Sequence, residues 1–167
     1  MKETARQEIV VGVSGSRASV AALRWAVDEA RRRCARLSVV CAWDHSRPAP
    51  YADRSEGRAR SDAQAAMRSS LAAAMRTALG PVPPAEIEAE MAEGAAERVL
   101  IDRSAVADLL VLGAARPQQA VGLPVGPVIR ACLARAGCPV VVVRASLGPA
   151  AGQPEGCPPA RVSALAG

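Results

Sequence analysis

Four short apolar runs, each long enough for one strand, constrain the fold of this chain more than any other feature. They cover residues 9–13, 37–43, 108–113 and 139–143. A run that is apolar on both faces is typical of a strand buried between two layers of helices. A fifth segment, residues 86–91, alternates acidic and apolar side chains. This alternation predicts an edge strand with one acidic face.

Helical patterns lie between these runs, because apolar residues recur there every three or four positions. The expected helices span residues 17–34, 63–78, 94–107 and 125–136. Ser16 is a good N-cap for the first helix, and Gly80 followed by Pro81 ends the second. In the third helix, Val99 and Val106 are expected on the same apolar side, together with Ala95.

Five strands alternating with four helices predict an α/β domain with a doubly wound, five-stranded parallel sheet of the Rossmann-like type. With 86–91 at one flank and 139–143 at the other, the strand order is 3-2-1-4-5. The winding direction then reverses between the strands that end at Val13 and at Gly113. A ligand crevice is expected at the carboxyl ends of those two strands.

The length of 167 residues suits one domain, which we place at residues 8–144. Residues 1–7 are interpreted as a flexible N-terminus, and residues 145–167, rich in Gly, Pro and Ala, as a disordered tail. Residues 44–57 are expected to form a mobile loop. No apolar run approaches the roughly 20 residues that cross a bilayer, and no signal peptide is apparent. We therefore expect a cytoplasmic protein without a membrane partner.

The composition argues against several kinds of site. His45 is the single histidine and Lys2 the single lysine, which excludes multi-histidine metal sites and a phosphate-binding lysine in an ordered loop. Aromatic residues make up 2% of the chain, too few for a platform that stacks nucleic-acid bases. The net charge is +5, but the arginines are spread over many segments. Neither a metal nor a nucleic-acid partner is expected.

The five cysteines are not arranged as a redox or metal motif. They are Cys34, Cys41, Cys132, Cys138 and Cys157, and none forms a C-x-x-C pair. Most lie in predicted core elements, where a reduced thiol behaves as a small apolar side chain. A thiol-based redox response, for example through Cys132 and Cys138, stays open as an alternative.

Several segments resemble the universal stress protein family in sequence, order and spacing. They are Ile9–Ser16, Ala22–Ala26, Ala107–Gly113, Gly126–Val128 and Gly137–Arg144. The resemblance covers residues 8–144 and implies the fold that the family shares with adenine nucleotide alpha hydrolases. It also implies a stress-response protein that forms a homodimer through its last strand. That interface would contain Val140, Val141, Val142 and Val143.

The nucleotide motif of that family is degenerate here. Members that bind ATP carry G-x-x-G, nine residues, then G-[ST], together with an acidic residue at the end of the first strand. Matched to this pattern, Arg116 replaces the second glycine, Pro127 the Ser or Thr, and Ser14 the acidic residue. The candidate nucleotide site, in this degenerate form, comprises Gly12, Ser14, Ala42, Gly113, Arg116, Gly126, Pro127 and Val128.

Pro127 has neither a hydroxyl nor a backbone N–H to offer a phosphate at a helix start. Two lost hydrogen bonds to a charged group weaken binding by about 3–6 kcal/mol. We therefore expect a non-enzymatic regulatory dimer with weak or lost ATP binding, an unidentified protein partner and no required cofactor. One alternative is a family member that binds ATP, with or without slow hydrolysis. Another is the thiol-based responder. If a nucleotide binds, we expect ATP or another adenine nucleotide at low affinity. No catalytic residue is assigned, since Asp108 lies at the opposite end of its strand from the crevice.

Overall fold

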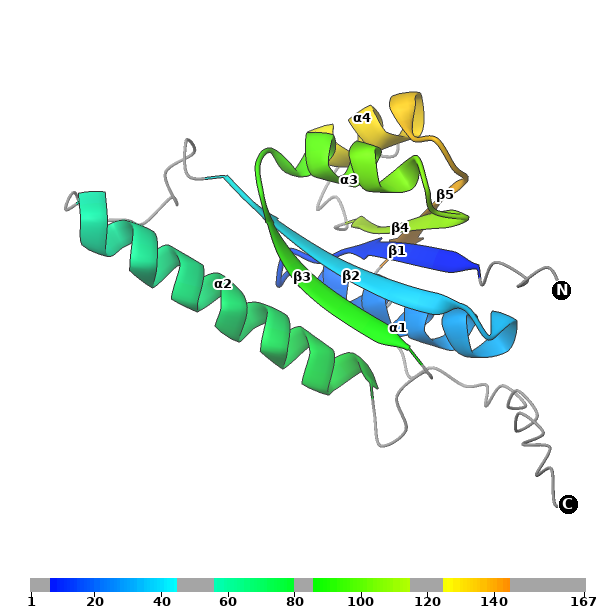
Figure 1. Ribbon diagram of the computed structural model, residues 1–167, viewed down its shortest axis with the longest axis horizontal. Coiled ribbons are helices and arrows are strands. Elements are labelled where there is room, and N and C mark those ends of the chain that lie inside the picture. The colour runs from blue at the N-terminus through cyan, green and yellow to red at the C-terminus, as the bar shows by residue number, and fades with distance from the viewer. Residues whose placement is uncertain (1–6, 45–55, 80–85, 115–124, 145–167) are drawn as a thin grey trace, which may run out of the picture.

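The computed structural model describes residues 7–44, 56–79, 86–114 and 125–144 (Figure 1). Its elements are β1 (Glu8–Gly12), α1 (Arg17–Arg33), β2 (Arg36–Trp43), α2 (Glu56–Leu79), β3 (Ile87–Glu93), α3 (Ala96–Ser104), β4 (Leu109–Ala114), α4 (Pro127–Arg135) and β5 (Val140–Arg144). The five strands form one parallel sheet in the order β3-β2-β1-β4-β5. The predicted fold class and strand order are confirmed.

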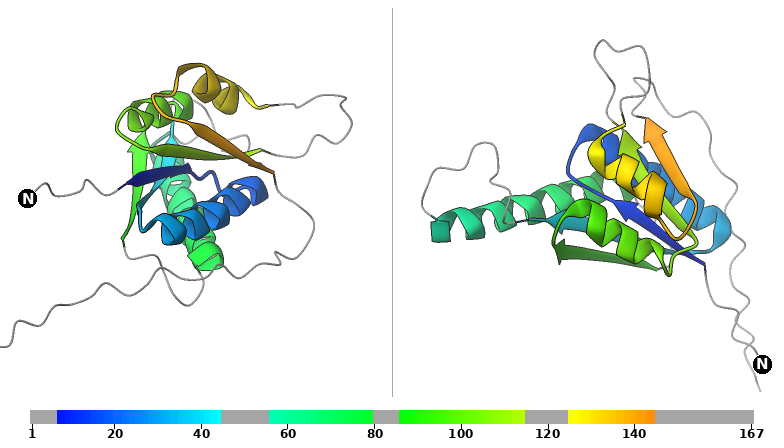
Figure 2. Two further views of the ribbon diagram at one scale, coloured as in Figure 1. Left: turned by 90° about the vertical axis from the view of Figure 1, so that its right-hand side faces the viewer. Right: turned by 90° about the horizontal axis from the view of Figure 1, so that it is seen from above.

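Two pairs of helices cover the two faces of the sheet (Figures 1 and 2). Alternate residues of the inner strands point to opposite faces of the sheet, so each strand contributes side chains to two hydrophobic cores. Val11 and Val39 pack with α1 and α2, whereas Val10 and Val40 pack with α3 and α4. All four are almost fully buried. This burial on both sides explains why the inner strands are apolar throughout.

The first helix begins and ends as its sequence indicates. Ser16 is its N-cap, and the Ser16 Oγ accepts a hydrogen bond of 3.2 Å from the Ser19 N–H. At the other end Cys34 takes the left-handed conformation with φ 53°. Arg31 lies in the last turn and donates a 2.9 Å bond to the carbonyl oxygen of Leu79. An arginine of α1 therefore stabilises the C-terminus of the neighbouring α2.

Both boundaries of the third helix differ from the sequence-based prediction. The third helix, α3, spans Ala96–Ser104 rather than 94–107, because Gly94 has a turn conformation with φ 134°. The hydroxyl of Ser104 donates to the Ile101 carbonyl and accepts from the Gly137 N–H, and the helix ends there. Val106 consequently lies in the following turn and is 78% exposed, so the prediction that it joins an apolar helix face is wrong.

The predicted mobile loop is also shorter than expected, since α2 already begins at Glu56. The edge strand β3 runs from Ile87 to Glu93, and Met91 and Ala92 are both partly buried, so its alternation is incomplete. The predicted flexible N-terminus (apart from Gln7) and the predicted tail 145–167 lie outside the described residues. Among the helices that the structure describes, none is long and apolar enough to cross a membrane.

Candidate ligand pocket

A pocket of about 160 Å³ opens at the carboxyl ends of β1 and β4, where the winding direction reverses. The residues that line it are Gly12, Val13, Ser14, Ser19, Val40, Ala42, Ala96, Leu100, Leu112, Gly113, Val128 and Ile129. They come from the ends of three strands and from the first half of α1, α3 and α4. The pocket therefore lies where a doubly wound sheet places its ligand.

The structure brings most of the predicted site residues together. The five that line the pocket are Gly12, Ser14, Ala42, Gly113 and Val128. Gly126 and Pro127 directly precede Val128 at the start of α4 but do not line the pocket. Arg116 lies outside the described residues.

The contribution of α3 to the pocket was missed by the sequence analysis. Ala96 and Leu100 line the pocket from the first turns of α3. The one signal for them was topological, because α3 follows the carboxyl end of β3 and begins at the same edge of the sheet as the crevice. Their side chains belong to no motif.

Gly113 is required by the packing of α1 against β4. A Cβ on this residue would lie 2.2 Å from the Ala18 carbonyl oxygen and 2.6 Å from the Ser19 N. Real Cβ atoms do not approach backbone so closely, and the helix backbone cannot give way as a flexible side chain can. The fold alone therefore explains the glycine at this position of the motif.

Gly126 has no such packing role. A Cβ built on it would meet nothing within 4 Å. Gly126 is the N-cap of α4 and contributes no side-chain cap, and Pro127 occupies the first helical position. The next two N–H groups, of Val128 and Ile129, have no partner within the helix. Among the described residues, nothing therefore fills the position of a side chain on Gly126 at the start of α4.

The hydroxyl groups near the pocket are used by the fold. Ser14 Oγ donates to Ser16 Oγ at 3.1 Å, and the Ser19 Oγ donates to the Ser16 carbonyl oxygen at 2.8 Å. Both bonds stabilise the loop that leads into α1. Ser14 is therefore part of the capping arrangement of α1 and supplies no negative charge at the end of β1.

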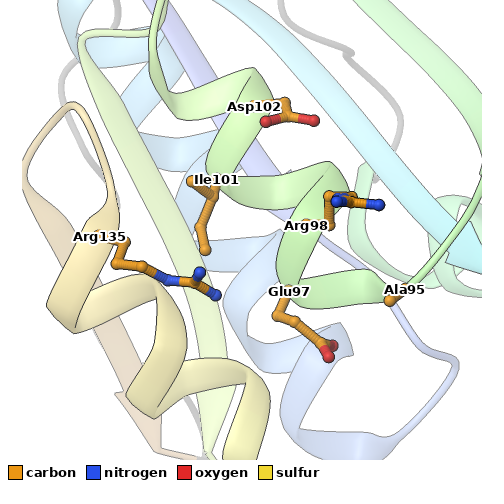
Figure 3. Close-up of a pocket in the computed structure, with 6 residues that line it drawn as sticks. All are labelled: Ala95, Glu97, Arg98, Ile101, Asp102 and Arg135. Carbon is orange, nitrogen blue, oxygen red and sulfur yellow. The ribbon is translucent and has the colours of Figure 1, made fainter.

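No charged side chain lines the pocket among the residues that the structure describes. A second, larger hollow of about 370 Å³ has the opposite character (Figure 3). It lies between α3 and α4 and is lined by Ala95, Glu97, Arg98, Ile101, Asp102 and Arg135. Figure 3 shows the Arg135 side chain extending from α4 towards α3. Its charges have both signs and it is outside the switch point of the sheet, so we do not take it as the nucleotide site.

Three cysteines of the described part of the chain are free thiols. Burial raises the pKa of Cys41, of Cys132 and of Cys138 above the ordinary value, so each is kept as the neutral thiol at neutral pH. A raised pKa disfavours the nucleophilic thiolate. Cys34, at the C-terminal end of α1, is not one of these free thiols.

Asp108 lies away from the pocket, as expected. Its carboxylate accepts a 2.8 Å hydrogen bond from the Glu8 N–H, at the amino ends of β1 and β4.

The valines of β5 lie at the outer edge of the sheet and each is partly exposed. Val141 and Val143 lie on the face of the sheet that α1 covers, whereas Val140 and Val142 lie on the face that α4 covers. Dimerisation through this strand stays a prediction.

The chain is similar to known proteins over most of its length. The family model described as the universal stress protein family matches residues 5–144. The chain is 34% identical over 141 residues to universal stress protein Rv2028c of Mycobacterium tuberculosis, which covers 81% of this chain and 47% of that protein. It is 28% identical over 153 residues to Rv2624c of the same organism, covering 87% of this chain and 51% of the relative. The chain thus spans about half the length of these curated relatives.

Solved structures have the same fold. A universal stress protein in complex with cAMP matches with a TM-score of 0.62 and 24% identity, over 86% of this chain and 100% of that one. The universal stress protein from Archaeoglobus fulgidus in complex with dAMP matches with a TM-score of 0.53 and 22% identity, over 82% and 97%. Because the family model covers most of the chain, and a curated member is 34% identical over 81% of it, this protein belongs to the universal stress protein family.

Proposed function

We propose that this protein is a non-enzymatic regulator of a stress response that acts in the cytoplasm as a homodimer and binds ATP weakly or not at all. The observation that carries the proposal is that the lining residues described for the switch-point pocket include no charged side chain, next to a helix that begins with Pro127. A nucleoside triphosphate brings several negative charges, and burying them without paired cations or donors is costly. Its output would pass to an unidentified protein partner.

The pocket residues also support a role without catalysis. General acid–base catalysis needs a titratable side chain within hydrogen-bond reach of the reacting group. The two polar side chains in the described lining are Ser14 and Ser19, and each donates its hydroxyl hydrogen to the loop before α1. Neither has a neighbouring base in this lining that would activate it as a nucleophile.

A second candidate function is binding of a nucleotide with a single phosphate. The open space at Gly126 and the N–H groups of Val128 and Ile129 favour it. Two of the structural neighbours are described as complexes with cAMP and dAMP. A monophosphate carries fewer negative charges than ATP, so burying it in a pocket without charged side chains costs less free energy.

Calorimetry with Mg-ATP at neutral pH tests the main proposal. The unmodified protein should give a dissociation constant near 1 mM, about −4 kcal/mol, or no heat. The triple variant Ser14→Asp, Arg116→Gly and Pro127→Ser should recover binding, because it restores the acidic residue, the small residue and the hydroxyl with its N–H. Tight micromolar binding by the unmodified protein would contradict the proposal. cAMP and AMP in the same experiment decide whether the second candidate is correct.

Dimerisation through β5 is tested separately. Antiparallel pairing of β5 with its copy would bury the valines and satisfy the open backbone edge. Val141→Lys or Val142→Lys places an ammonium group in or beside that seam. At least one of them should be monomeric at micromolar concentration in sedimentation equilibrium, with an unchanged circular dichroism spectrum. Ala89→Lys on β3, at the opposite edge of the sheet, is the matched control and should stay dimeric. A monomeric unmodified protein would refute this part of the proposal.

A further inference from the structure

The hollow between α3 and α4 has room for a small molecule. Its volume is about 370 Å³, within the range of about 300–1,000 Å³ that is usual for ligand pockets. The Ile101 side chain lies between the two helices, beside the end of the Arg135 side chain (Figure 3). This hollow is separate from the switch-point pocket, which Ala96 and Leu100 line from another flank of α3.

Four charged side chains surround the hollow, and they are not paired with one another. They are Glu97, Arg98, Asp102 and Arg135. Within the part of the chain that the structure describes, none of them takes part in an ion pair or a side-chain hydrogen bond. Elsewhere on α3, by contrast, the Arg103 guanidinium lies 2.7 Å from the Glu90 Oε1. A ligand in the hollow therefore has no internal ion pair to break.

Glu97 and Arg135 approach the hollow from different helices. Glu97 is in the first turn of α3, and Arg135 is in the last turn of α4. The Cys132 thiol is fully buried, and this burial is the main cause that raises its pKa. The Glu97 carboxylate raises the same pKa further, whereas the Arg135 guanidinium lowers it. Both charges are therefore close to one buried point between α3 and α4.

The combination of charges restricts the ligand that fits. A simple anion is attracted by the two guanidinium groups but repelled by the two carboxylates, and a simple cation meets the reverse. A molecule with one ammonium and one carboxylate finds a partner for each group. Because Glu97 and Arg135 do not form an ion pair with each other, the two charged groups of such a molecule must also be held apart.

We propose that this hollow binds a small zwitterion whose ammonium and carboxylate stand at opposite ends of a short uncharged chain, as in a dipeptide. The Arg135 guanidinium binds the carboxylate, the Glu97 carboxylate binds the ammonium, and Ile101 contacts the chain between them. The inference goes beyond the proposed function, since it concerns a different site. Tight or weak ATP binding leaves it unchanged, and absence of a zwitterion site leaves the ATP result unchanged.

The experiment titrates the full-length protein with the dipeptide alanyl-alanine and follows amide NMR shifts. Its N-acetylated form lacks the ammonium and its C-terminal amide lacks the carboxylate, so these two compounds are matched probes. The titrations are run at about pH 6.5, where a free α-amino group is protonated. The dipeptide should bind in the millimolar range and shift the amides of Ile101 and Arg135. Each blocked form should bind about fivefold more weakly, as expected for loss of a partly exposed ion pair.

Two variants assign the ends of the ligand. In Arg135→Gln, amidation of the dipeptide should no longer change its affinity, whereas acetylation should still weaken binding about fivefold. In Glu97→Gln the two effects should be exchanged. Arg103→Gln is the matched control, because this arginine pairs with Glu90 instead of lining the hollow, and it should bind the dipeptide as the unmodified protein does.

Three results would overturn the inference. The first is no amide shift with the dipeptide at concentrations up to about 20 mM. The second is a blocked form that binds the unmodified protein as tightly as the dipeptide does. The third is a response to both blocking groups that stays complete in Arg135→Gln and in Glu97→Gln, since the ligand would then contact neither residue.

Discussion

Helices α1 and α4 begin at the same edge of the sheet, on opposite faces, and their first turns serve different purposes (Figure 2). The start of α1 is fully used by the fold: Ser16 caps it, and its backbone lies against Gly113. The start of α4 has Gly126 as an N-cap without a side-chain bond, followed by Pro127. One helix start is closed by packing, and the other is left open.

This difference changes what the family motif means in this chain. Gly113 and Gly126 are both glycines of the phosphate pattern and look equivalent in the sequence. Gly113 is explained by the close approach of α1, so its presence says nothing about a ligand. Gly126 has open space around its Cα, so the fold does not explain it. The two glycines therefore carry different weight as evidence for a phosphate site.

The largest expected effect comes from Gly113→Ala. Its methyl group would overlap the backbone of Ala18 and force α1 away from β4, at a cost of about 3 kcal/mol or more. Urea unfolding followed by circular dichroism measures this loss. Gly126→Ala should change the free energy of unfolding by less than about 0.5 kcal/mol. Equal effects of the two substitutions would remove the distinction between the helix starts.

Ser16→Ala tests the closed start of α1 and should have a smaller effect. It removes the side-chain cap of the Ser19 N–H and the acceptor for the Ser14 hydroxyl. Loss of an N-cap costs about 1 kcal/mol. Thermal unfolding should show a lower midpoint for Ser16→Ala, and Pro127→Ala at the start of α4 should change it less. A larger loss at Pro127 would mean that α4, too, is fixed at its start by the fold.

The smallest expected effect concerns the other end of α1, where Glu29 accepts hydrogen bonds from Arg32 and Arg33. The hydrogen bond from Arg32 is the main cause that lowers the pKa of Glu29 below its ordinary value of 4.5, and Arg33 adds to it. A lowered pKa stabilises the fold above the ordinary value, and the stabilisation is lost as the pH falls through the folded-state pKa. Glu29→Gln should therefore cost less than about 1 kcal/mol at pH 7 and nothing in strong acid.

Thermal unfolding of both proteins between pH 7 and pH 3 measures this dependence. The Arg32→Gln, Arg33→Gln pair provides the control, because adding Glu29→Gln to it should have little further effect. A difference between Glu29→Gln and the unmodified protein that stays constant with pH would show that the ion pairs do not contribute.

The sequence predicted the fold well because each strand and helix has a local signal. The inner strands are apolar on both faces, Ser16 caps α1, and Gly80 with Pro81 follows the last residue of α2. The errors occurred where a tertiary contact decides a boundary. The bonds of the Ser104 hydroxyl end α3 three residues earlier than predicted, and one partner, Gly137, is 33 residues away in the chain.

The site was predictable in part. The ends of β1, β2 and β4, marked by Gly12, Ala42 and Gly113, were correctly placed at one pocket, because parallel strands end at a common edge. The contribution of α3 was not predictable from a motif, since Ala96 and Leu100 reach the pocket through the way α3 lies on the sheet. The size of the pocket and its apolar floor were likewise absent from the sequence analysis.

The sequence by itself determined the order of strands and helices, the α/β class with its parallel sheet, and the departures from the phosphate motif. These properties depend on residue type and spacing along the chain. The tertiary structure alone decided which glycine of the motif serves the fold and which is open to a ligand. That distinction depends on the distance between the backbone of α1 and the end of β4, segments that are separated by about 90 residues and meet only when the sheet has formed.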